Sequence, residues 1–281
     1  MRIKAVGKEN RDRKLTELRE LIIAIKGAGE MASAVAWRLY MAKLGKVLML
    51  DIEKPLAVRR EVAFCEAVHD GHKTVEAVEA VRVRDLSDTL QAWKCEKIAV
   101  AADPQWQLLN KLRPNLIVDA ILAKRNLGTR MKDAELVIGL GPGFEAGNDV
   151  HMVIETNRGH DLGRIITEGS AETNTGIPGP IGGFSQKRVL RSPTDGKFTP
   201  CRSIGEHVAA DEIIATVEGE VVRANISGVI RGLMRSDTQV TRGLKIGDID
   251  PRGLKRNCYT ISEKARAIGG SVLEAVLRVY N

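Results

Sequence analysis

The chain has 281 residues and a formal net charge of +7, with 43% hydrophobic and 28% charged residues. This length exceeds that of a typical single domain, so two domains are expected, and the composition argues against a disordered or membrane-embedded chain. The cations are scattered and only 4% of the residues are aromatic, so a nucleic-acid partner is not expected.

The charged N-terminal segment MRIKAVGKENRDRKLTELREL alternates in charge sign. It lacks the apolar core of a signal peptide, and no apolar run in the chain approaches the length of a membrane span, so no membrane association is expected. The cysteines Cys65, Cys95, Cys201 and Cys258 are far apart and form no CxxC pair. These features favour a protein of the reduced cytoplasm.

A strand, a glycine turn and a helix are predicted next, in that order. The apolar run LIIAI at 21–25 leads into GAGEMASAVAWRLYMAKLG, whose apolar residues have helical spacing. Gly27 suits a tight turn, Gly29 would allow close approach of a pyrophosphate, and Ala32 replaces the third glycine of the dinucleotide-binding fingerprint. The phosphates would lie at the N-terminus of the helix. The alternative is a packing turn that binds no ligand.

The second predicted strand, VLML at 47–50, ends at Asp51. The separation of Asp51 from Gly27 along the chain is close to the spacing of a ribose-binding carboxylate in dinucleotide-binding proteins. A carboxylate that accepts a hydrogen bond from the ribose 2′-hydroxyl would favour NAD over NADP. The expected cofactor is therefore NAD or a related nucleotide.

Apolar runs at 80–83, 97–103, 115–121 and 135–140 continue the alternation of strands with helical or polar segments. The pattern predicts an α/β fold whose first domain, residues 1–160, is a doubly wound Rossmann-like parallel sheet. Ligands of such sheets lie outside the carboxyl ends of the strands. Asp103 and Asp119 are therefore expected to face the same crevice as GAGEMA.

Two loops are candidates to line this crevice. The GLGPGF loop after the last predicted strand either lines the pocket or is only a turn that needs positive φ at Gly141 or Gly143. Beyond Asp119, the side chains of Lys124, Arg125 and Asn126 suit a phosphate or carboxylate, although a solvated helix start is the alternative. A small anionic ligand is expected on this basis.

The segment DVHMVIETNRGH, which follows the GLGPGF loop, contains His151, Glu155, Arg158 and His160. Histidine and glutamate are common metal ligands, but no HExxH or other open-site signature is present. No metal is therefore predicted. His151 and Arg158 are expected instead to hydrogen-bond the ligand or to position a lid.

The second half of the sequence contains an internal duplication. It follows a connecting segment at 161–188, which is rich in glycine and proline and is interpreted as a linker or a loop that closes over a ligand. The segments that begin at Arg191 and Arg223 then match at a constant offset, which also relates Gly196 to Gly228. The repeat predicts a β domain at 189–260 with two interlocked halves, which resembles the barrel-sandwich hybrid of biotinyl and lipoyl carriers. The central turn at 218–220 reads EGE, so a carrier lysine is absent there.

A C-terminal helix is predicted for 261–281, with Ser262 as its N-cap and an apolar stripe along one side. The stripe indicates that this helix packs against one of the domains.

Several motifs occur together and in a distinctive order. They are GAGEMASAVAWRL, DIEKPLAVRR, DAILAKRNLGTR, VIGLGPGFEAGNDVHMVIETNRGHDLGR, NTGIPGPIGGFS and IGDIDPRG. With them, the sequence is similar to the YqeB family, accessory proteins of selenium-dependent molybdenum hydroxylase systems. The resemblance implies a role in the maturation or support of a xanthine dehydrogenase-like client enzyme. It assigns no catalytic residue.

Two classes of function remain open from the sequence. The first is a maturation factor that binds a nucleotide, a pterin cofactor or the client enzyme. The second is an NAD-dependent oxidoreductase that acts on a small substrate, for which Asp119 and Lys124 are the candidates to exchange a proton. Whether the chain has catalytic turnover and whether it forms a homo-oligomer both stay open.

Overall fold

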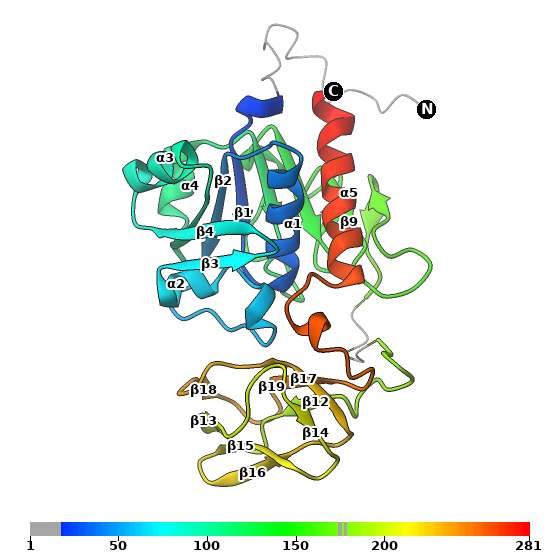
Figure 1. The fold of residues 1–281 in the computed structure, drawn as a ribbon. Coiled ribbons are helices and arrows are strands. Elements are labelled where there is room, and N and C mark those ends of the chain that lie inside the picture. Colours follow the sequence, from blue (N-terminus) through cyan, green and yellow to red (C-terminus); the bar gives the residue numbers. More distant parts are fainter. Residues whose placement is uncertain (1–17, 174–175, 177–178) are drawn as a thin grey trace, which may run out of the picture.

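The computed structural model describes residues 18–173, 176 and 179–281. The rest of the chain, which includes most of the charged N-terminal segment and part of the connecting segment, lies outside the described residues. The chain forms an α/β unit and a smaller β module, with the module placed beyond one end of the large sheet (Figure 1).

The α/β unit is built on a nine-stranded sheet of order β10-β9-β7-β6-β1-β2-β5-β4-β3. All pairs from β9 through to β4 are parallel, and the two edge pairs, β10 with β9 and β3 with β4, are antiparallel. The strands are β1 (Ile23–Lys26), β2 (Val47–Asp51), β3 (His72–Val75), β4 (Val78–Val83), β5 (Ile98–Ala102), β6 (Leu116–Asp119), β7 (Leu136–Leu140), β9 (Met152–Ile154) and β10 (Ile165–Ile166). The α/β class predicted from the sequence is confirmed.

Helices cover both faces of the sheet, because the central strands are apolar on both sides. Ile23 and Ile25 pack in the core that contains α1 (Glu30–Met41), α2 (Glu66–Asp70) and α5 (Glu263–Tyr280), whereas Ala24 faces α3 (Leu86–Lys94) and α4 (Gln107–Leu112). The shorter elements are η1 (Leu18–Glu20), η2 (Arg60–Val62), η3 (Met131–Asp133), η4 (Lys255–Cys258), β8 (Glu145–Ala146) and β11 (Gly169–Ser170).

The C-terminal helix α5 returns to the α/β unit and lies beside α1 (Figure 1). A Cβ at Gly269 would lie 2.9 Å from the carbonyl oxygen of Ala34, so glycine allows the two helix backbones to approach closely. The sheet also extends past residue 160, the expected end of the first domain. β10 lies in the expected connecting segment, where Ile166 pairs with Val153 and covers the edge of β9.

The β module contains two four-stranded sheets of order β12-β19-β17-β14 and β16-β15-β13-β18. Its strands are β12 (Val189–Arg191), β13 (Gly196–Pro200), β14 (His207–Val208), β15 (Ile213–Val217), β16 (Glu220–Arg223), β17 (Gly228–Leu233), β18 (Gln239–Val240) and β19 (Lys245–Asp250). The constant offset that relates Arg191 to Arg223 also superposes the first four strands on the last four, and each sheet takes two strands from each half.

The module core follows the same repeat. Phe198 and Ile214 of the first half correspond to Ile230 and Ile246 of the second, and all four are buried in one cluster. Each half therefore depends on the other to cover its apolar residues, as expected for interlocked halves.

Candidate functional site

The parallel strands of the sheet direct their carboxyl ends toward the β module (Figure 1). A cavity of about 350 Å³ lies between the two units, and we call it the interdomain cleft. Its cationic lining residues are Arg59, Lys124, Arg158, Arg188, Arg231, Lys245 and Lys264, and its acidic lining residues are Glu30 and Glu172. This excess of positive charge in a concave site favours an anionic ligand.

Glu30 and Met31, the first residues of α1, line the cleft, and the glycine loop directly precedes them. Gly27 has φ +93°, and a Cβ there would lie 3.1 Å from the carbonyl oxygen of Ala120, so both the turn and the contact with the end of β6 require glycine. Gly29 is the N-cap of α1, has no side-chain cap, and has open space where a Cβ would stand. An uncapped helix N-terminus beside open space suits a phosphate. Ala32 is buried in the core beneath it.

Asp51 holds this glycine loop in place. Its Oδ2 accepts a hydrogen bond from the Ala28 amide at 2.8 Å, and its Oδ1 accepts one from the Ile52 amide. Burial raises the pKa of Asp51 despite these two donors, which act in the opposite direction. The carboxylate is therefore at the expected strand end, with one oxygen already engaged by the loop.

A cationic cluster, in which Arg188 and Arg231 are buried and Lys245 is partly exposed, forms the β-module side of the cleft. Asp248 is fully buried, accepts hydrogen bonds from Arg188 and Arg231, and lies 3.9 Å from Nζ of Lys245. Burial lowers the pKa of both Arg188 and Lys245, and the neighbouring Asp248 carboxylate only partly offsets this. One carboxylate thus faces three cations, and an anion bound in the cleft would supply part of the missing negative charge.

Arg59 connects the two units at the base of the cleft. It donates to Glu30 at 2.8 Å, to the carbonyl oxygen of Asn257 at 2.7 Å and to that of Thr260 at 2.9 Å. Ser262, the N-cap of α5, donates to the same Glu30 carboxylate at 2.9 Å. The starts of α1 and α5 and the end of the β module are thereby held together.

Of the residues predicted for the crevice beside the strand ends, Lys124 and Arg158 line the cleft, and Arg158 also pairs with Glu263. Arg125 is exposed and does not line it. Asn126 closes its own loop, because its Oδ1 accepts from the amides of Gly128 and Thr129.

Asp103 has a structural role at the start of α4. Its two carboxylate oxygens accept hydrogen bonds from the amides of Gln107 at 2.9 Å and Leu108 at 2.7 Å. Both oxygens are therefore used to satisfy the first turn of the helix, away from the interdomain cleft.

The GLGPGF loop is a tightly packed turn at the margin of the cleft. Gly141 and Gly143 have φ +76° and +103°, and a Cβ at Gly141 would lie 2.5 Å from Oγ1 of Thr156, while one at Gly143 would lie 2.9 Å from Cα of Arg125. Pro142, between them, lines the cleft. The loop is therefore a turn with positive φ at both glycines, and Pro142 is its cleft-lining residue.

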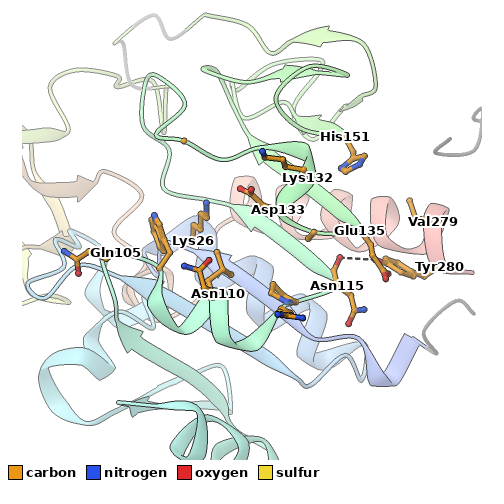
Figure 2. Close-up of a pocket in the computed structure, with 16 residues that line it drawn as sticks. Lys26, Gln105, Asn110, Asn115, Lys132, Asp133, Glu135, His151, Val279 and Tyr280 are labelled. Carbon is orange, nitrogen blue, oxygen red and sulfur yellow. Dashed lines mark hydrogen bonds between the residues drawn. The ribbon is translucent and has the colours of Figure 1, made fainter. Parts of the chain in front are cut away.

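His151 lies at a different cavity, shown in Figure 2. Its Nδ1 accepts a hydrogen bond from the Val137 amide at 3.0 Å, and burial lowers its pKa. This cavity, of about 760 Å³, runs along the sheet between α4 and η3, and we call it the sheet-face groove. Lys26 lines the groove, and Asp119 is linked to Lys26 through Thr129.

Sequence patterns did not single out Arg59, Arg188, Arg231, Lys245, Lys264 or Lys26. Arg59 lies within the motif DIEKPLAVRR, and Asp248 lies within IGDIDPRG, so the motifs themselves contained a signal. Within residues 18–173, 176 and 179–281, no group of three or more His, Cys, Asp or Glu side chains is placed to hold a metal. No described helix is both long enough and apolar enough to cross a membrane.

Together, the fold and the cleft define a two-part α/β protein with a cationic site between a largely parallel sheet and a duplicated β module. No protein-family model matches the chain. The chain is 47% identical to the uncharacterized protein YqeB of Escherichia coli (strain K12) over 260 residues, which are 92% of this chain and 48% of that protein. The similarity to YqeB thus extends over nearly the whole of the present chain, which spans about half the length of that curated relative.

Solved structures with partial similarity include an aspartoacylase family protein from Mesorhizobium loti, at 10% identity and a TM-score of 0.27, with 81% of this chain and 84% of that chain covered. A succinylglutamate desuccinylase from a Silicibacter species has 11% identity and a TM-score of 0.25, with 82% and 84% covered. Similarity this low assigns no activity to the present chain.

Proposed function

We propose that the chain is an accessory protein that binds a nucleotide or a similarly anionic cofactor in the interdomain cleft and supports maturation of a selenium-dependent molybdenum hydroxylase. The cationic excess of the cleft is the observation that carries the binding proposal. The role with a xanthine dehydrogenase-like client rests on the sequence resemblance to the YqeB family.

The α/β unit supports this proposal through the glycine loop and the start of α1. A phosphate in the open space beside Gly29 would meet the uncapped helix N-terminus, where the backbone amides and the helix dipole favour negative charge. Lys124 and Arg158 lie on the same cleft and can donate to further anionic oxygens. A doubly wound Rossmann-like character of the sheet is part of this proposal.

The β module supports the proposal through cations that Asp248 holds in the cleft. In a barrel-sandwich-hybrid-like module the turn between the halves would carry a modified lysine, but here the turn joins β15 to β16 through Glu218 and Gly219, with φ of +48° and +83°. The module would instead bind the ligand through Arg188, Arg231 and Lys245, which line the cleft. A ligand that contacts both units would stabilise their relative placement. It would thereby also stabilise the protein surface to which a client enzyme could bind.

A second candidate function is that of an NAD-dependent oxidoreductase, which the position of Asp51 at the end of β2 favours. The candidate proton-transfer residues are separated, however, because Lys124 lines the interdomain cleft whereas Asp119 lies beside the sheet-face groove. Reduction of NAD by the purified protein with small alcohols or hydroxy acids would favour this function over the accessory role.

Isothermal titration with NAD and with pyrophosphate tests the binding proposal. For whichever of the two probes the native protein binds, Gly29→Val should weaken binding by at least about tenfold, because the valine side chain fills the space that a phosphate would occupy. Gly45→Val is the matched control, since Gly45 also has open space at its Cβ and lies away from the cleft. Equal binding by both variants, or no binding of either probe to the native protein, would contradict the proposal.

The client role needs a separate readout. Cells that depend on this chain for a selenium-dependent hydroxylase should lose that activity with Gly29→Val and keep it with Gly45→Val. If both variants keep full hydroxylase activity, support of the client does not depend on ligand binding in the cleft, even if the purified protein binds the probe.

A further inference from the structure

A buried lysine lies in the sheet-face groove, outside the interdomain cleft (Figure 2). Lys26, the last residue of β1, is only 4% exposed. Its Nζ donates to Oγ1 of Thr129 at 2.7 Å and lies 5.0 Å from the centre of the Trp106 ring. The amine is thus held in one place and faces a cavity of about 760 Å³.

Thr129 connects this amine to a carboxylate. Its hydroxyl donates to Oδ2 of Asp119 at 2.6 Å, and Asp119 is the residue of β6 that pairs with Lys26 in the sheet. A hydroxyl that accepts from one group and donates to another can pass a proton between them. The three side chains therefore form a short relay from the groove into the sheet.

Burial shifts both ends of the relay toward their neutral forms. It lowers the pKa of Lys26, although the charges of Asp119 and Asp133 act in the opposite direction. It also raises the pKa of Asp119, against the hydrogen bonds from Thr129 and Ile121 and the charge of Lys26. Transfer of a proton from the ammonium to the carboxylate is therefore less unfavourable here than in water, and a neutral lysine is a nucleophile.

We propose that Lys26 forms a Schiff base with a small aldehyde bound in the sheet-face groove. The ammonium proton first moves through Thr129 to Asp119, and the free amine adds to the aldehyde carbon as the C=O π bond opens. A proton then moves from nitrogen to the new oxygen. Asp119 returns its proton to that hydroxyl, which leaves as water as the C=N bond forms. The products are a protonated imine and water, with Asp119 ionised again.

The groove also accounts for the kind of aldehyde. Its lining includes the apolar side chains of Leu109, Pro114 and Trp106, the last of which lies against Lys26. Asn110 and Arg113 add polar groups to the same lining. These surfaces suit a small aromatic or alkyl aldehyde that carries a polar or anionic group. Trp106 has φ +59°, a conformation that is costly for a bulky residue, and its ring is nevertheless held against the Lys26 amine.

Reductive labelling tests this proposal. The native protein is incubated with benzaldehyde and sodium cyanoborohydride near neutral pH, and the benzylated lysines are quantified by peptide mass spectrometry. Lys26 should be labelled at least about tenfold faster than the exposed Lys54, because burial increases its neutral fraction. In urea the two rates should become equal. Labelling of native Lys26 at or below the rate of Lys54 would overturn the proposal.

Two substitutions at Thr129 separate the relay from burial alone. Thr129→Val has nearly the same shape but no hydroxyl, so Lys26 labelling should fall toward the Lys54 rate. Thr129→Ser keeps the hydroxyl and should retain most of the preference. If Thr129→Val, with an unchanged melting temperature, is labelled as fast as the native protein, the relay has no part in the reaction.

Discussion

Replacement of Asp248 by asparagine removes the carboxylate that holds the cationic cluster of the interdomain cleft. Asp248 is fully buried and is bonded to both Arg188 and Arg231, so Asp248→Asn leaves these guanidinium groups buried without their counter-charge. Removal of one partner from a buried ion pair costs about 3 to 5 kcal/mol. Because small domains are stable by only about 5 to 15 kcal/mol, the free energy of unfolding should fall by a large fraction.

Urea denaturation followed by far-ultraviolet circular dichroism measures this loss, and hydrogen exchange of the β17 and β19 amides locates it in the β module. Glu212→Gln is the control in the same module, since Glu212 lies 3.7 Å from Arg202 in a partly exposed pair worth less than about 1 kcal/mol. The reasoning is refuted if Asp248→Asn lowers the free energy of unfolding no more than Glu212→Gln does. A large loss confined to the α/β unit would also refute it.

Two further predictions concern charges near the same cleft. Arg158→Ala should weaken pyrophosphate binding in isothermal titration by at least about tenfold, because Arg158 lines the cleft. Arg125→Ala should leave binding unchanged, because Arg125 does not line the cleft. Equal loss of binding in the two variants would contradict the different roles given to these residues. Burial opposes ionisation of Asp250, but hydrogen bonds from the side chain and backbone of Arg252 prevail and lower its pKa from 3.8 to about 2. The stability that results is present above the unfolded pKa and is lost as pH falls from 3.8 through about 2. Over that pH range the free energy of unfolding, measured by urea denaturation, should fall by about 2 kcal/mol more for the native protein than for Asp250→Asn. Equal falls in the two proteins would contradict the lowered pKa of Asp250.

Local sequence patterns predicted those elements whose conformation depends on residues close together in the chain. The strand, glycine turn and helix at 21–45 were predicted because a tight turn needs positive φ, which Gly27 has at +93°. The constant offset between the two repeats predicted the interlocked halves of the β module, because each strand recurs at that spacing and neither half buries its core alone. The sequence resemblance to YqeB likewise depended on motifs visible without a structure.

The arrangement of those elements was decided by tertiary structure. β5 lies between β2 and β4 in the sheet, an order that hydrophobic periodicity does not encode because it records which face is buried and not which strand is adjacent. The same limit applies to individual side chains. Asp103 occupied the expected strand end, but the nearby amides of α4 engage both of its oxygens.

The amino-acid sequence by itself determined the α/β class, the glycine loop and the β repeat, since each is written in residues close together in the chain. Only the folded chain brought Arg59, Arg188 and Lys264 to one cleft and placed Lys26 beside Asp119 in another cavity. These residues are far apart in the sequence, and a lone cation gives no local signal of what it will meet. The candidate sites arise from long-range contacts, because burial and electrostatic pairing act through space.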